Sequence, residues 1–151
     1  MESSLIERLE KRISDLEKRV LKLENREKTL VWKDENTKLY WEIKEDRDSL
    51  LTYFQAQKYI ELLNLRKYGG FSDWKIPTKE ELETIFDLED QPFILKPLLP
   101  NIPIKFKPIF WSATEDKDRK SLKWVAYFNH GYGDFKYQSQ KYYLMATRKY
   151  Q

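Results

Sequence analysis

The residues best suited to chemistry lie in the last third of the chain, where cationic and aromatic side chains alternate. Residues 100–151 contain ten Lys and Arg against four Asp and Glu, whereas residues 31–99 contain ten against fourteen. Cations beside aromatic rings suit anionic sugars and protein hot spots, and also single-stranded nucleic acid. We predict a loop surface that binds a glycan or a protein ligand. Its candidate residues are Lys117, Arg119, Lys120, Asn129, His130, Tyr132, Asp134, Lys136, Tyr137 and Lys141.

The same region offers no recognisable catalytic group. His130 is the single histidine and cysteine is absent, so a His-based metal cluster and a cysteine nucleophile are both excluded. Asp116, Asp118 and Asp134 would support at most a weak calcium site in the loops. We therefore predict that the protein is not an enzyme and that it has no cofactor and no metal centre.

The first thirty residues predict a helical stalk that would carry this surface. Their apolar residues alternate by steps of three and four, which is the heptad pattern of a coiled coil. No glycine or proline interrupts the run, and an isolated helix of this polarity would be marginal in water. The seam therefore predicts oligomerisation, with Ile6, Ile13 and Val20 at heptad position a, and Leu9, Leu16, Leu23 and Leu30 at position d.

The number of strands in the coiled coil follows from two competing patterns. Branched residues at position a with leucine at position d favour two strands. Against this, Arg12-Ile13-Ser14-Asp15-Leu16-Glu17 resembles a trimer signature in which an arginine packs over the core and pairs with a glutamate of a neighbouring strand. The pattern recurs one heptad later, with Arg19, Val20, Leu23 and Glu24 in the same places. We predict a parallel homotrimer, with a dimer as the alternative.

After residue 30 the pattern changes to that of a mixed α+β domain. Two short strands are expected on either side of a turn at Asp34-Glu35-Asn36, followed by helices that begin at Thr52 and Thr78 with capping boxes. Residues 90–108 hold five prolines and predict a loop. Further strands are expected at 109–114, 122–128 and 142–148, with a glycine-bearing turn at 129–134 after the second of them.

The motifs of this domain occur in the order of a known family. Gly69-Gly70-Phe71-Ser72-Asp73-Trp74-Lys75-Ile76-Pro77-Thr78 resembles the signature of the Lcl C-terminal-like family, and Thr37 to Trp41 resembles its opening strand. Phe110 to Thr114, Trp124 to Phe128 and Met145 to Arg148 resemble its later strands. The resemblance implies a C-type-lectin-like head whose chain ends pair in one sheet. It also implies a binding function, since the family includes a trimeric bacterial adhesin for sulfated glycosaminoglycans.

The heptad pattern predicts a coiled-coil stalk at residues 1–30, and the resemblance implies a C-type-lectin-like binding domain at residues 31–151. We expect an adhesin or receptor-binding module, or alternatively a structural protein of a phage tail or similar particle whose head docks to a protein. A nucleic-acid partner ranks below both: the basic last third allows it, but a coiled-coil stalk does not point to nucleic-acid binding. The sequence shows no membrane span and no signal peptide. Its location is expected to be cytoplasmic by default, or virion-associated or cell-surface by a non-Sec route.

Overall fold

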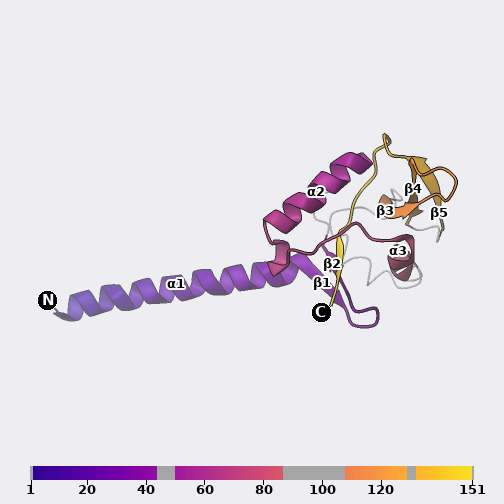
Figure 1. Cartoon of the computed structure of the whole chain (residues 1–151). Coiled ribbons are helices and arrows are strands. Elements are labelled where there is room, and N and C mark those ends of the chain that lie inside the picture. The colour runs from indigo at the N-terminus through magenta and orange to yellow at the C-terminus, as the bar shows by residue number, and fades with distance from the viewer. Residues whose placement is uncertain (1, 44–49, 87–107, 129–131, 151) are drawn as a thin grey trace.

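Figure 1 shows the computed structural model of the chain, in which one long helix projects from a mixed α+β head. The structure describes residues 2–43, 50–86, 108–128 and 132–150. Helix α1 (Glu2–Leu30) is the projecting element, and strand β1 (Val31–Asp34) follows it without a loop. The change of period at residue 30 therefore coincides with the change from helix to strand.

The first sheet of the head joins its two chain ends. Strand β2 (Leu39–Glu42) lies between β1 and β6 (Thr147–Lys149), and both pairings are antiparallel. Asp34 holds the β1–β2 turn by accepting hydrogen bonds from the Asn36 backbone N–H at 3.0 Å and from the Thr37 hydroxyl at 2.7 Å. The prediction that the chain ends pair in one sheet is confirmed.

Two helices follow, and each begins at a predicted capping box. Helix α2 (Tyr53–Leu65) is capped by Thr52, whose hydroxyl accepts from the Gln55 N–H while the Gln55 side chain accepts from the Thr52 N–H. Helix α3 (Lys79–Phe86) begins with the same reciprocal pair between Thr78 and Glu81. These bonds satisfy N–H groups that the first helical turn leaves unpaired.

A short 3₁₀ turn, η1 (Tyr68–Gly70), connects α2 to the segment before α3. Gly69 and Gly70 have φ of 62° and 90°, so both adopt left-handed backbone, which glycine reaches without the steric cost of a side chain. Trp74 lies beyond this turn and is buried, with its indole N–H donating to the Tyr68 carbonyl at 2.9 Å. The glycine pair thus turns the chain so that Trp74 can enter the core.

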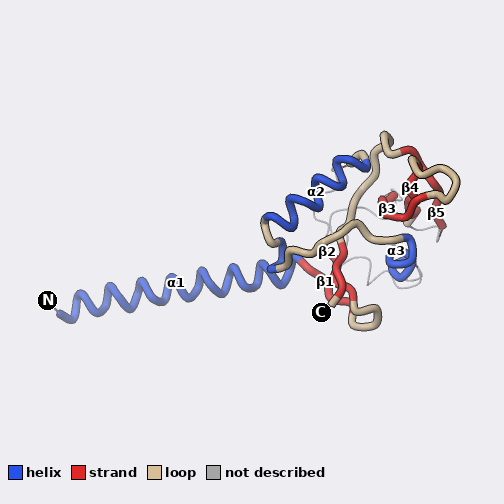
Figure 2. The backbone as a smooth tube through the Cα atoms, viewed as in Figure 1, coloured by secondary structure: helices blue, strands red, loops and turns tan. Residues whose placement is uncertain are grey.

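The second sheet consists of three antiparallel strands in sequence order. Strand β4 (Leu122–Tyr127) lies between β3 (Ile109–Glu115) and β5 (Tyr132–Tyr137). On the β5 side, Leu122 opposes Tyr137 and Tyr127 opposes Tyr132. Figure 2 shows this sheet on the side of the head away from α1, whereas β1, β2 and β6 lie near the end of α1.

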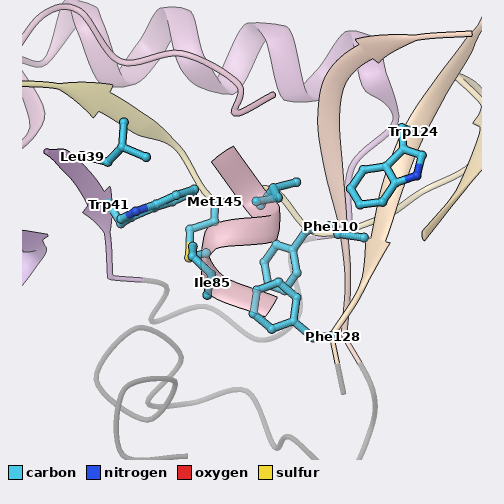
Figure 3. Close-up of a cluster of buried hydrophobic side chains, with 9 residues drawn as sticks. Leu39, Trp41, Ile85, Phe110, Trp124, Phe128 and Met145 are labelled. Carbon is cyan, nitrogen blue, oxygen red and sulfur yellow. The ribbon is translucent and has the colours of Figure 1, made fainter. Parts of the chain in front are cut away.

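The two faces of the second sheet pack against different helices, because successive side chains of a strand point to opposite sides. On one face, Phe110 and Trp124 join Leu82 and Ile85 of α3 in a cluster that also includes Trp41 (Figure 3). On the opposite face, Trp111 of β3 and Val125 of β4 pack against α2. Their partners in this cluster are Tyr53 and Ala56 of α2, together with Leu144. The α+β class is therefore confirmed.

Two predicted strand boundaries are wrong. The expected turn at 129–134 overlaps strand β5, which begins at Tyr132. Gly133 lies within this strand, where a Cβ would overlap the Trp124 ring and the Val125 carbonyl, so the position requires glycine. The glycine therefore admits the indole ring of a neighbouring strand and does not mark a turn.

The predicted strand 142–148 is also divided. Only residues 147–149 form β6, because the segment before it crosses from the second sheet to the first. Tyr142 pairs with Leu51, Tyr143 exchanges backbone hydrogen bonds with Ile109 and Trp111, and the Ala146 carbonyl accepts from the Glu42 N–H. The segment is thus a buried connection that bonds to several elements in turn.

Candidate functional site

The first candidate surface is the apolar seam of α1. Its six described residues are between 50% and 59% exposed; they are Ile6, Leu9, Ile13, Leu16, Val20 and Leu23. Among the described elements, the main contacts of the head with α1 come from η1 and β1, and Figure 1 shows the head at the C-terminal end of α1. A stripe of this size left in water is a strong driving force for association.

A shallow apolar depression occupies the middle of the seam. It is lined by Ile13, Leu16, Glu17, Val20 and Leu21. In a parallel coiled coil, a side chain at position d packs into a hole formed by four residues of the facing helix. Four of the five lining residues occupy consecutive a, d, e and a positions, so the depression matches such a hole in composition and place.

The charged residues that flank the seam are available to a neighbouring chain. Within the described part of the chain, Arg12, Glu17 and Arg19 form no ion pair with their own helix. The Glu24 side chain lies outside the described residues, as does that of Leu30. Pairing between chains at these positions remains a prediction.

The second sheet separates the predicted ligand residues into two groups. The turn after β3 carries Lys117, Arg119 and Lys120, and it lies beside the end of β5 at Tyr137. The start of β5 at Tyr132 lies at the opposite end of the sheet, five residues or about 17 Å away. The single loop surface expected from the sequence is therefore two surfaces.

The first of these surfaces is the basic end, which we define as Lys117, Arg119, Lys120, Tyr137 and Lys141. All five residues are exposed. Its two turns are joined by a hydrogen bond from the Gln138 side-chain amide to the Ser121 carbonyl at 3.0 Å. The cations of the two turns therefore share one end of a sheet.

Asp116 shapes the turn of the basic end. One of its carboxylate oxygens accepts from the backbone N–H groups of Asp118 at 2.9 Å and Arg119 at 3.3 Å, and the other accepts from the Arg119 guanidinium at 3.1 Å. The backbone bond from Asp118 is the main reason that the pKa of Asp116 lies below its ordinary value. The turn is held in place and Arg119 is partly neutralised, so its exposed charges are Lys117, Lys120 and the carboxylate of Asp118.

The second surface is the tyrosine face, which we define as Tyr127, Tyr132, Asp134, Lys136 and Tyr142. The rings of Tyr127 and Tyr132 lie 5.4 Å apart between centroids, and the Lys136 ammonium lies 3.6 Å from the Asp134 carboxylate. A hydrogen bond with Tyr127 raises the pKa of Lys136, so this lysine stays cationic. Burial raises the pKa of Tyr142. Flat rings beside a cation and a carboxylate are suited to a sugar or a polar protein surface.

Two residues of the tyrosine face were not among the predicted ligand residues. Tyr127 joins the tyrosine face through its pairing with Tyr132, and Tyr142 reaches it from the connection to β6. A period-two pattern over 132–137 was the available signal for β5, but Gly133 obscures it. Asn129 and His130 lie outside the described residues.

The described residues contain no group of three or more His, Cys, Asp or Glu side chains arranged to hold a metal ion. Among the same residues, no helix is both long and apolar enough to cross a membrane. Asp116, in the turn of the basic end, pairs with Arg119, and Asp134 of the tyrosine face pairs with Lys136.

Comparison with known proteins identifies the family of the head. Residues 30–148 match the family described as the Lcl C-terminal domain. A search of proteins with curated descriptions finds no significant match. The matched segment includes both sheets except for Lys149 at the end of β6, helices α2 and α3, and every residue of the basic end and the tyrosine face. The chain belongs to the Lcl C-terminal domain family.

Proposed function

We propose that the chain is a non-enzymatic ligand-binding protein that acts as a parallel trimer. The half-exposed seam of α1 carries the proposal, because association is what removes six apolar side chains from water. The depression around Leu16 supports parallel, in-register packing. The arginines at position g and glutamates at position e favour three strands, and two strands remain the alternative.

The head supplies the binding surface in this proposal. The turns of the basic end lie on the side of the head away from α1 (Figure 1). In the proposed trimer, these turns would therefore lie at the end opposite the stalk, where one ligand could reach three heads. The lysines of the basic end and the exposed Tyr137 ring suit an extended anionic glycan, which offers both charge and flat sugar faces. Three weak contacts on one stalk would combine into strong avidity.

Heparin retention and a glycan array at several salt concentrations test the proposal. The full chain should bind anionic glycans, and added salt should weaken binding because the charges are exposed. Replacing Lys117, Lys120 and Lys141 together by glutamine should abolish retention. A matched variant with Lys58, Arg66 and Lys67 replaced by glutamine removes the same charge from α2 and the residues after it, and should bind nearly as the parent does.

The role of the stalk is tested in the same assays. An Ile13→Lys variant with intact lysines at the basic end should bind much more weakly if avidity matters. Equal loss in the two triple variants would show that only net charge counts, and the basic end would be rejected as a site. No glycan binding by any variant would move the function to the alternative, a head that docks to a protein of a larger particle.

A further inference from the structure

The tyrosine face lies on the edge strand of its sheet and gathers three polar groups. Strand β5 is the last strand of that sheet, and Tyr132, Asp134 and Lys136 alternate along it, so their side chains point to the same side. Tyr127 lies opposite Tyr132, yet it forms a hydrogen bond with Lys136, which lies farther along β5. The side chains of Tyr127 and Lys136 therefore reach toward each other beside Asp134.

The Asp134 carboxylate is held in place although it is exposed. One of its oxygens accepts from the Phe135 backbone N–H at 2.8 Å, and the other lies 3.6 Å from the Lys136 ammonium. The side chain is nevertheless 63% exposed. A carboxylate oxygen can accept more than one hydrogen bond, so a ligand can bond to an acceptor whose position is already fixed. Such an acceptor lowers the entropic cost of binding.

The aromatic rings of the face have a packed base and one exposed member. Tyr127 and Tyr142 are partly buried against the cluster that includes Trp111 and Val125, and the rings of Tyr142 and Trp111 lie 5.0 Å apart. The ring of Tyr132 lies 5.4 Å from that of Tyr127 with 42° between the ring planes, and Tyr132 is 59% exposed. The face thus offers one flat, supported ring beside the fixed polar groups.

The charges on this side of the sheet offset one another. Lys136 pairs with Asp134, and Lys123, which lies opposite Lys136 on β4, pairs with Glu115 at 2.8 Å. Two cations and two carboxylates leave no excess charge among these four residues, in contrast to the basic end. An anionic ligand would therefore gain little here, whereas an uncharged ligand with hydroxyl groups could use both the donor and the acceptor.

We propose that the tyrosine face binds a neutral sugar ring, which stacks on Tyr132 while its hydroxyls bond to Asp134 and Lys136. A pyranose presents C–H groups on its flat side, which pack on an aromatic ring, and hydroxyls at its rim, which both donate and accept. Alternate residues of a strand are about 7 Å apart, so a sugar stacked on Tyr132 brings its rim to Asp134.

This site is separate from the basic end and needs no second chain. It therefore depends neither on the trimer nor on the binding of anionic glycans proposed above. It would give the head a preference among glycans that charge alone cannot provide, because hydrogen bonds to fixed groups distinguish the arrangement of sugar hydroxyls.

Saturation-transfer NMR on the full chain tests this site, because the method detects weak binding of small ligands. The neutral probes are the methyl β-glycosides of glucose, galactose and mannose, and each is compared with the matching uronic acid glycoside. At least one neutral probe should receive saturation, and it should receive more than its charged counterpart does.

Variants then locate the binding. Tyr132→Ala should weaken the affinity for that probe roughly tenfold, and Tyr132→Phe should retain it, since stacking requires only the ring. Asp134→Asn should also weaken it by about tenfold, because a charged acceptor is lost. Phe54→Ala removes a ring of similar exposure, 64%, from α2 and should leave the affinity unchanged.

Three results would overturn the site. They are no saturation of any neutral probe, equal affinity in the parent, Tyr132→Ala and Asp134→Asn, and stronger Tyr132-dependent saturation of a uronic acid glycoside. The first would leave a polar protein surface as the ligand of this face. Heparin retention is measured separately: a chain that heparin retains but that shows no saturation loses this site and keeps the proposed function, and the reverse result keeps this site alone.

Discussion

Helix α1 keeps its apolar seam half in water, whereas the head encloses Trp41, Phe110 and Trp111 completely. Both regions are rich in large apolar residues, and the difference lies in what a single chain can cover. The head has two sheets and two helices that cover its apolar side chains. Helix α1 has a narrow apolar stripe, and a single helix cannot bury its own stripe. From this comparison we expect the head to fold by itself and, in line with the function proposed above, the stalk to associate with other copies.

The largest expected effect comes from placing a charge in the seam. Ile13→Lys should abolish the oligomer, because the ammonium would have to enter the apolar interface between helices. The head should keep its thermal midpoint, since its core makes no use of Ile13. Light scattering and thermal unfolding check the two halves of the prediction. Ser14→Lys, one residue away at position b, should leave the oligomer intact.

Inside the head, the largest loss of folding stability is expected from removing the buried cation of Arg148. Its guanidinium pairs with Asp73, with one bond at 3.1 Å, and lies over the Phe71 ring at 3.8 Å. The Asp73 side chain is 43% exposed, so water can solvate the carboxylate that Arg148→Met leaves behind. Loss of the charge-assisted bonds should lower the free energy of unfolding by about 1.5–3 kcal/mol. Denaturant unfolding measures this loss. Lys149→Met, at the exposed neighbouring position, is the control and should change it by less than about 0.5 kcal/mol.

Gly133→Ala should destabilise the head by about 1–3 kcal/mol, because the added methyl group needs space occupied by the Trp124 ring. The strain should also change the tryptophan fluorescence of the folded protein. Asp134→Ala alters the adjacent exposed residue and should cost far less. Equal losses in the two variants would mean that the ring does not pack as described.

The smallest expected effect is a change in how folding stability falls at low pH when Asp73 is replaced. The hydrogen bond from Arg148 is the main cause that lowers the pKa of Asp73, with burial opposing it. A carboxylate whose pKa is lower in the folded state contributes stability above its unfolded pKa of about 3.9, and loses it as pH falls below that value. Asp73→Asn should therefore flatten the acid side of the stability curve. Unfolding midpoints between about pH 7 and pH 2.5 measure the change. An unaltered curve would show that other carboxylates, such as Glu115 paired with Lys123, dominate the acid response.

Local patterns in the sequence predict much of the fold. The helix over residues 2–30 and the two capping boxes depend on neighbours within four positions, so they can be seen without a structure. The motif from Gly69 to Thr78 identifies the family before any contact is known. Strand β5 and the connection at 142–146 depend on distant partners such as Trp124, Leu51 and Ile109, so their boundaries were wrong.

The candidate site was predictable in its residue types and not in its layout. Exposed lysines and tyrosines in the last third are visible in the sequence, and most of those named lie at the surface. Their division into the basic end and the tyrosine face follows from the register of β4 with β5. Strand register depends on the pairing of whole segments, so the sequence alone could not separate Lys117 from Tyr132.

The pairing of β2 with both β1 and β6 has a practical consequence for attaching other proteins. The backbone N–H of Tyr150 donates to the Lys38 carbonyl, and the C-terminus lies near the end of α1 (Figure 1). A partner fused to the C-terminus would be carried beside the stalk and would point away from the distal turns. The head could thus be immobilised, or fused to another protein, through its C-terminus. The outward turns, such as 116–121, would remain accessible and could be varied in sequence.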